Sequence, residues 1–195
     1  MKIQIVLYDD FEALDVFGPV EVFSKCEELE LCFCSMMGGP IRSTQGFTVQ
    51  TESIECCSPA DVLFLPGGMG ARTLVNDQDF LRKLHHYTNL AAQCLSVCTG
   101  SALLAKCGVL NGKFATTNKR SYTWATSQSH EVHWLAKARW VVDGKFYTSS
   151  GVSAGTDMAL GFISDTFGRK KAEEIAHRIE YIWNDDPNHD LFEVH

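Results

Sequence analysis

Short, continuous apolar runs alternate with helical patterns along the chain, and this alternation restricts the fold more than any other feature. Residues 62–65 (Val-Leu-Phe-Leu) carry no polar side chain and are closed by Pro66-Gly67-Gly68. A strand that is apolar at every position is typical of a parallel sheet covered by helices on both faces. We therefore predict an α/β fold, a three-layer sandwich whose mostly parallel sheet is flanked by helices.

The predicted elements follow one another in the order strand, helix, strand, helix. Strands are expected at 2–8, 30–35, 62–65, 91–97 and 114–117, at the edge over 47–51, and in a hairpin over 139–148 with Asp143-Gly144 at its turn. Helices are expected at 16–26, 77–88, 100–107, 155–167 and 169–183, with Pro19 in the first turn of the first helix and a turn at Gly38-Gly39-Pro40. Because no linker or repeat interrupts this order, we expect one domain over residues 1–195.

The composition limits the partners of such a domain. Hydrophobic residues make up 45% of the 195 residues, enough for a sizeable core. Lys and Arg number 17 against 24 Asp and Glu, so the formal net charge is −7. A chain with this balance has no surplus of positive charge to neutralise phosphates. We expect a small-molecule substrate, and neither a nucleic acid nor a membrane as partner.

Eight cysteines raise the question of disulfides and metals. The apolar run that begins at Met1 ends at Asp9-Asp10, which is too short for a signal peptide, so we expect a cytoplasmic protein with reduced thiols. Cys32-x-Cys34 and the adjacent Cys56-Cys57 lack the two-residue spacing that zinc ligands usually show. The sequence therefore predicts no metal and no cofactor.

Cys98 occupies the most informative position in the chain. The apolar segment that ends at Val97 runs directly into the small residues Thr99-Gly100-Ser101, which begin a helix. A nucleophile at such a strand-to-helix turn is presented at the rim of the sheet, and unpaired N–H groups of the helix favour its thiolate. We predict an exposed, ionised nucleophile. The alternative is a small hydrophobic residue buried in the core.

Two loops are expected to face Cys98. Gly67 and Gly68 follow a covered strand. Their backbone N–H groups, together with that of Thr99, would surround a negative charge that develops opposite Cys98. The alternative is that the glycines only form a turn. The loop after the first strand holds Glu12 and Asp15. Asp15 lies between apolar neighbours, which favour desolvation and so raise a carboxyl pKa, and it is therefore a better candidate than Glu12 for an acid or base. The alternative is that Asp15 caps the following helix.

No histidine stands out as a partner for Cys98. After Thr116-Thr117, where a general base is often presented, the chain has Asn118, whose amide orients a group but does not titrate. Asn118, together with Glu12 and Gly151, is predicted to line the pocket.

Four segments together resemble the ThiJ/PfpI superfamily. They are Asp61 to Leu65 with Pro66-Gly67-Gly68, Ser96 to Ser101, Leu110 to Thr117, and Gly151 to Asp157. The resemblance spans roughly residues 3–182 and implies a glutamine-amidotransferase-like, flavodoxin-like sandwich that commonly forms a homodimer. Within the superfamily, Leu14-Asp15-x-x-Gly18-Pro19 and Val97-Cys98-Thr99-Gly100 are most similar to the isonitrile hydratase branch.

The resemblance also implies a reaction. In that branch the cysteine, here Cys98, adds to the isonitrile carbon, the aspartate, here Asp15, assists proton transfer, and water releases an N-substituted formamide. This chain has Asn118-Lys119 where the branch usually has His-Trp, which leaves the substrate open. The alternatives are a glyoxalase or deglycase, a protease or amidase, which would need a histidine near Cys98, a redox sensor, and a non-catalytic ligand domain like that of related transcription regulators.

Overall fold

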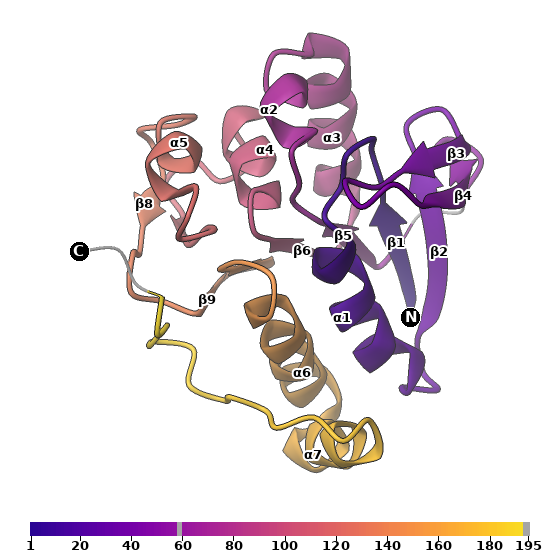
Figure 1. The fold of residues 1–195 in the computed structure, drawn as a ribbon, viewed down its shortest axis with the longest axis vertical. Coiled ribbons are helices and arrows are strands. Elements are labelled where there is room, and N and C mark those ends of the chain that lie inside the picture. The colour runs from indigo at the N-terminus through magenta and orange to yellow at the C-terminus, as the bar shows by residue number, and fades with distance from the viewer. Residues whose placement is uncertain (58–59, 193–195) are drawn as a thin grey trace.

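The computed structural model describes residues 1–57 and 60–192, and its centre is an eight-stranded sheet (Figure 1). The main-sheet strands are β1 (Lys2–Val6), β2 (Glu30–Ser35), β3 (Gly39–Arg42), β4 (Thr48–Ser53), β5 (Val62–Leu65), β6 (Gln93–Val97), β9 (Trp140–Asp143) and β10 (Phe146–Ser149). Their spatial order is β3-β4-β2-β1-β5-β6-β10-β9. The strands from β4 to β10 pair in parallel, and antiparallel β3 and β9 close the two edges.

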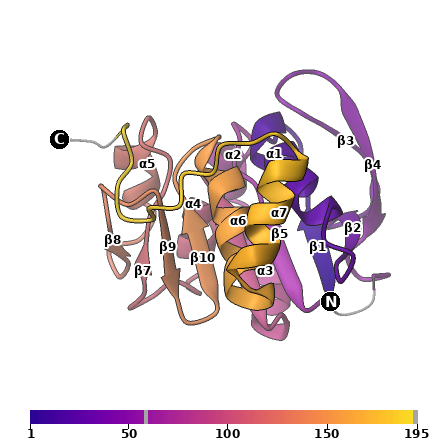
Figure 2. The same cartoon turned by 90° about the horizontal axis from the view of Figure 1, so that it is seen from below.

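Helices cover both faces of this sheet, which confirms the predicted three-layer α/β fold. The helices are α1 (Ala13–Ser24), α2 (Ala71–Leu74), α3 (Gln78–Leu90), α4 (Gly100–Lys106), α5 (Tyr122–Thr126), α6 (Ala154–Phe167) and α7 (Arg169–Arg178). One layer holds α1, α6 and α7, and the opposite layer holds α2, α3 and α4 (Figures 1 and 2). No helix in the described part of the chain is both long enough and apolar enough to cross a bilayer.

Aromatic contacts tie the α1–α6 layer to the sheet. The ring of Phe23 from α1 meets Phe64 of β5 edge to face at 5.9 Å between centroids, and meets Phe162 of α6 at 6.1 Å. All three side chains are fully buried. Edge-to-face packing of large aromatic rings adds to the free energy gained from burial. The helix that carries Asp15 is thereby fixed against the central strands.

Several elements differ from the prediction for identifiable reasons. Helix α1 begins at Ala13, so Pro19 lies inside the helix and not in its first turn. The predicted turn at Gly38 to Pro40 instead opens β3, which takes the edge position expected for the 47–51 strand, now β4. Pairing with β4 supplies the hydrogen-bond partners that local sequence does not reveal.

The second half of the chain holds two further corrections and one confirmed element. The predicted 114–117 strand shrinks to β7 (Phe114–Ala115), which pairs with β8 (His133–Trp134) outside the main sheet. Helix α7 ends at Arg178, five residues before the predicted end, and Glu180 adopts a positive φ of 54°. The β9–β10 hairpin and its turn are confirmed, with Gly144 at a φ of 60°.

After α7 the chain crosses the molecule as an extended tail toward β8 and α5 (Figure 2). Backbone bonds anchor this tail: the N–H of Arg139 donates to Pro187 O at 2.8 Å. The buried guanidinium of Arg139 also pairs with Asp157 of α6 and faces Asp190. A backbone hydrogen bond to Pro187 and the ion pair with Asp190 therefore hold the tail in its path across the molecule.

Candidate active site

Cys98 forms a sharp turn between the end of β6 and the start of α4. Its φ is 57°, in the left-handed region that costs a side-chain-bearing residue about 1–3 kcal/mol. The Cys98 N–H donates to Ser150 O at 2.9 Å, and its carbonyl accepts from the hydroxyls of Ser101 at 2.9 Å and Thr117 at 3.1 Å. These bonds from three other positions hold the strained residue in place.

The glycine after the turn lets the backbones approach. A Cβ added to Gly100 would lie 2.6 Å from Leu65 O of β5, so no larger residue fits between this helix start and the strand beside it. The strand-to-helix elbow predicted from small residues is thus present.

Asp15 projects from the first turn of α1 into the same place. Its side chain is fully buried, and its Oδ2 accepts a 3.0 Å hydrogen bond from the N–H of Gly67. The other oxygen, Oδ1, is buried with no hydrogen-bond partner among residues 1–57 and 60–192. Asp15 is therefore not the helix cap considered above, because Glu12 occupies that position and Asp15 bonds to a different loop.

Burial dominates the protonation of both groups. It raises the pKa of Asp15 to about 7, although interactions with the Cys98 thiol and the Gly67 amide oppose the rise. Burial, and then the charge of Asp15, also raise the pKa of the Cys98 thiol well above its usual value, against the lowering effect of the Thr99 amide. Each group is among the causes of the other's pKa shift, so the thiol and the carboxyl are close neighbours.

The prediction of an exposed, ionised Cys98 is therefore wrong. The side chain is 7% exposed, and the desolvation of its sulfur outweighs the donors at the start of α4. Sequence reasoning weighed the donors at the helix start but did not include the burial caused by the tertiary layers. At rest Cys98 is a thiol beside a carboxyl group that titrates near neutrality.

The glycine loop is in place, but its amides are already engaged. The N–H of Gly67 holds Asp15, and the N–H of Gly68 donates to the Thr99 hydroxyl at 3.0 Å. A Cβ on Gly67 would lie 2.6 Å from Thr99 N and 2.8 Å from Asp15 Oδ2. Of the three predicted backbone donors, the Thr99 amide is the one that acts on the Cys98 sulfur.

The predicted pocket residues lie around this elbow at different depths. Glu12 precedes α1, donates its N–H to Gly67 O at 2.9 Å, and its charge contributes to the raised pKa of Asp15. The Asn118 amide covers Gly151 so closely that an added Cβ would lie 2.0 Å from Nδ2, while its Oδ1 accepts from Ser121 N. Asn118 and Gly151 therefore contact each other, and Asn118 forms no hydrogen bond with Cys98.

Sequence reasoning missed Tyr8. This residue follows β1, is buried, and donates its hydroxyl proton to Pro66 O at 2.8 Å. Burial raises its pKa well above the usual value, and the neighbouring Asp15 and Cys98, when they ionise, raise it further, so the phenol stays neutral. A side chain with a hydroxyl group directly after the apolar residues 5–7 was the available signal. Tyr8 also lines a neighbouring hollow of about 490 Å³, whose walls include Met36, Leu74 and Phe80.

The fold and the elbow place this chain among α/β sandwich proteins that carry a cysteine at the strand-to-helix turn. Residues 1–165 match the DJ-1/PfpI family, and the chain belongs to that family, as the sequence motifs predicted. It is 30% identical over 184 residues to the isonitrile hydratase of Pseudomonas putida, an alignment that covers 93% of this chain and 78% of the hydratase.

Two solved structures share the fold of this chain. A ThiJ/PfpI family protein from Pseudomonas syringae superimposes with a TM-score of 0.81 at 26% identity, covering 95% of this chain and 76% of that one. Drosophila melanogaster DJ-1beta has a TM-score of 0.81 at 18% identity, covering 93% and 98%. The second likeness concerns the fold alone.

Proposed function

We propose that this protein is an enzyme in which Cys98 adds to a small electrophile, and that its reaction is the hydration of an isonitrile to an N-substituted formamide. One observation carries the proposal: the buried carboxyl of Asp15, with a pKa of about 7, lies beside the buried thiol of Cys98. A group that titrates near the working pH is suited to both giving and taking a proton. The similarity to isonitrile hydratase over nearly the whole chain supports this choice of substrate.

The first half of the reaction forms a thioimidate. Ionised Asp15 takes the proton of the Cys98 thiol as the sulfur bonds to the terminal carbon of R–NC. The same proton then passes from Asp15 to that carbon, which gives R–N=CH–S–Cys98. Because the thiol is protonated at rest, its activation depends on Asp15.

The second half releases the formamide. Water adds its oxygen to the thioimidate carbon and its proton reaches nitrogen, giving R–NH–CH(OH)–S–Cys98. The carbon–sulfur bond then breaks, the hydroxyl proton returns to sulfur through Asp15, and R–NH–CHO leaves. The Thr99 amide, which lowers the pKa of Cys98, stabilises the sulfur as it departs. Gly67 and Gly68 contribute by holding Asp15 and Thr99 in position.

The structure favours this reaction over redox sensing at the same cysteine. A sensor cysteine is typically accessible and has a low pKa, because the thiolate is the species that peroxide oxidises. Cys98 is buried, and its pKa is raised. A small neutral electrophile that enters the site and reacts with assistance from Asp15 suits this environment better.

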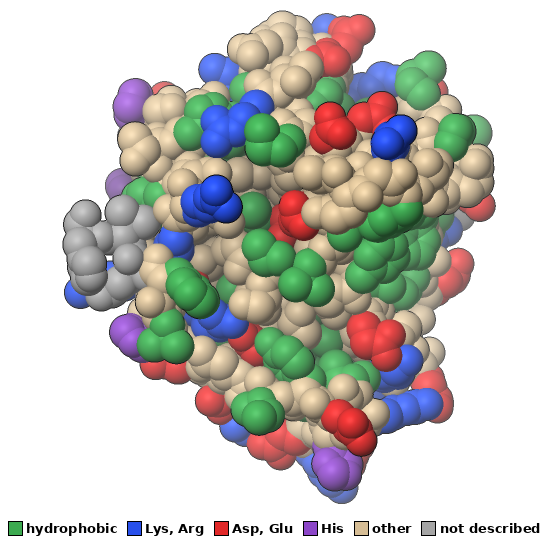
Figure 3. Space-filling view, in the orientation of Figure 1, with side chains coloured by type: hydrophobic (Ala, Val, Ile, Leu, Met, Phe, Trp, Pro, Cys, Tyr) green, Lys and Arg blue, Asp and Glu red, His purple; other side chains and the backbone are tan. Residues whose placement is uncertain are grey.

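We also propose that the chain forms a homodimer through the outer face of α1. Leu14, Phe17 and Phe47 are between 39% and 49% exposed, and the rings of Phe17 and Phe47 lie 5.6 Å apart. Hydrophobic side chains gather on this face of the molecule (Figure 3). Exposed apolar groups of this kind favour association. Sedimentation of the wild type and of Phe17→Glu tests the proposal: a dimer that the variant converts to monomer is expected, and a wild-type monomer would contradict it.

The reaction is tested with a substrate panel. Isonitriles, methylglyoxal, glyoxal, and peptide or amide substrates are offered to the wild type, to Cys98→Ala and to Cys94→Ala. Cys94 is the control because it is buried like Cys98 but lies within β6. We expect isonitrile turnover that only Cys98→Ala abolishes, with its circular dichroism unchanged. Full activity of Cys98→Ala would refute a nucleophilic role. Turnover confined to dicarbonyls or amides would refute the hydratase assignment.

A further inference from the structure

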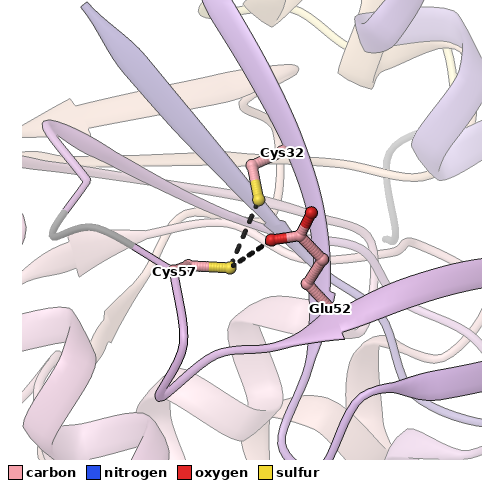
Figure 4. A group of neighbouring side chains, drawn as sticks. All are labelled: Cys32, Glu52 and Cys57. Atoms are coloured by element: carbon pink, nitrogen blue, oxygen red, sulfur yellow. Dashed lines mark hydrogen bonds between the residues drawn. The ribbon is translucent and has the colours of Figure 1, made fainter.

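A second group of thiols lies on the β2–β4 side of the sheet, where strands β1 and β5 separate it from β6 and the elbow. The Sγ atoms of Cys32 and Cys57 are 3.3 Å apart, and Cys57 Sγ is 3.7 Å from Glu52 Oε2 (Figure 4). One ligand atom from each of the three residues lies within 4.8 Å of the others. We refer to Cys32, Glu52 and Cys57 as the Cys32–Cys57 cluster.

The fold explains why residues 25 positions apart meet here. Cys34 of β2 pairs with Glu52 of β4, and Cys32 lies on the same face as Cys34, two residues earlier. After β4 the chain turns back, because the N–H groups of Cys56 and Cys57 both donate to Ser53 O. The spacing rule that excluded zinc applies to ligands on one local loop, and this cluster is built from two strands and a turn.

We propose that the Cys32–Cys57 cluster binds one divalent cation of the zinc class. Bonds of about 2.3 Å to sulfur and 2.1 Å to oxygen in a tetrahedral site place neighbouring ligand atoms roughly 3.6–3.8 Å apart. The observed 3.7 Å sulfur–oxygen separation fits, and the 3.3 Å pair of sulfurs needs only to open slightly. The site is distinct from Cys98 and does not depend on the proposed hydratase reaction.

The donor set selects among cations. Two thiolates with one carboxylate suit Zn²⁺, whereas Mg²⁺ and Ca²⁺ prefer oxygen ligands throughout. Binding exchanges two thiol protons for two metal–sulfur bonds, and Glu52 contributes as a carboxylate, so each ion bound releases two protons. Cys32 and Cys57 are partly exposed and Glu52 is exposed, so an ion has access and a water molecule can complete the tetrahedron.

Cobalt binding tests the proposal with a readout independent of catalysis. The full chain, reduced with a phosphine and freed of metal, is titrated with Co²⁺ without oxygen, and the thiolate-to-cobalt absorption is recorded. We expect one Co²⁺ per chain, displaced by Zn²⁺. Cys32→Ser and Cys57→Ser should lose the absorption, and Glu52→Gln should weaken binding by at least about tenfold.

Two matched controls keep the result interpretable. Cys56→Ser changes an exposed thiol next to the cluster and should keep the absorption, and Cys98→Ala should keep it as well. No absorption in the wild type, or absorption that survives in both Cys32→Ser and Cys57→Ser, would refute the site. A Cys32–Cys57 disulfide formed with peroxide, found by mass spectrometry in a protein that binds no Co²⁺, would replace the cation site by a redox pair.

Discussion

The elbow around Cys98 and the Cys32–Cys57 cluster use the same side-chain chemistry, thiol with carboxyl, in opposite surroundings. Cys98 and Asp15 are both buried between the layers. Cys98 itself adopts a left-handed conformation, and the glycines around it lie too close to other atoms to carry a side chain. The cluster is partly exposed, with Cys32 and Glu52 on ordinary extended strands. Burial favours the protonated forms of Cys98 and Asp15, which suits them to acid–base chemistry. Access from solvent suits the Cys32–Cys57 cluster to binding a metal ion in exchange for its thiol protons.

The largest expected effect separates the two regions by activity. Asp15→Asn removes the proton carrier beside Cys98 and should lower kcat/KM for isonitrile hydration by about 10²–10⁴-fold. The cobalt absorption of the Cys32–Cys57 cluster should not change. The control is Asp10→Asn, which changes an exposed carboxylate in the turn between β1 and α1, at a φ of 60° that Asn tolerates. A loss below tenfold in Asp15→Asn would remove Asp15 from the mechanism.

The pH dependence of stability tests the burial of Asp15. A carboxyl pKa raised from 3.8 to about 7 means that the folded state holds a proton which the unfolded state has released. The free energy of unfolding therefore falls as pH rises from about 4 to 7, by up to about 4 kcal/mol at 1.4 kcal/mol per pH unit. Asp15→Asn has no carboxyl to ionise, so its free energy of unfolding should not fall in this way. Urea unfolding at pH 5 and pH 8 should therefore show that the stability of the variant relative to the wild type is greater at pH 8. Parallel profiles would contradict the raised pKa.

Gly67→Ala tests the close packing of the elbow. The added methyl would lie within 2.8 Å of Thr99 and Asp15, so we expect about 1–3 kcal/mol of destabilisation and a loss of hydratase activity. Gly39→Ala is the control, because its Cβ meets no atom within 4 Å and only the φ of 93° is unfavourable, costing about 1 kcal/mol. Denaturant unfolding and turnover measure both. Equal costs at the two positions would show that the loop moves freely.

The smallest expected effect is a difference in backbone strain between Cys98 and Cys32. At Cys98, glycine should be more stable than alanine by about 1 kcal/mol, because φ is 57°. At Cys32, on extended β2, alanine should be more stable than glycine by about 0.5–1 kcal/mol. Unfolding of the four variants gives the two differences, and the same sign at both positions would argue against strain at the elbow.

Local pattern was sufficient for the elements that are apolar throughout or end in strong turn residues. The strand over 62–65 and the Asp143-Gly144 hairpin follow from such signals, and both are confirmed. Pro19 misled, because a proline inside a helix is tolerated where packing against α6 holds the helix together. Segments whose partners lie far away in the chain, such as β3, were not predictable from propensity.

The candidate site divides in the same way. The positions of Cys98, Asp15 and Gly67 at one rim follow from the order of parallel strands, since each residue follows a strand's carboxyl end in sequence. Tyr8 was missed because its significance depends on its burial near Asp15. Cys57 and Cys32 were set aside by spacing, and only the turn at Ser53 brings them together.

The sequence by itself determined the parallel α/β architecture, the family, and the elbow that carries Cys98, because these depend on short-range apolar runs and small residues. Only the tertiary structure decided the protonation of Cys98 and Asp15 and the meeting of Cys32 with Cys57. The physical reason is that desolvation and contacts between distant strands arise from how the layers pack together, and no local pattern of residues records the surface that each side chain loses to its neighbours.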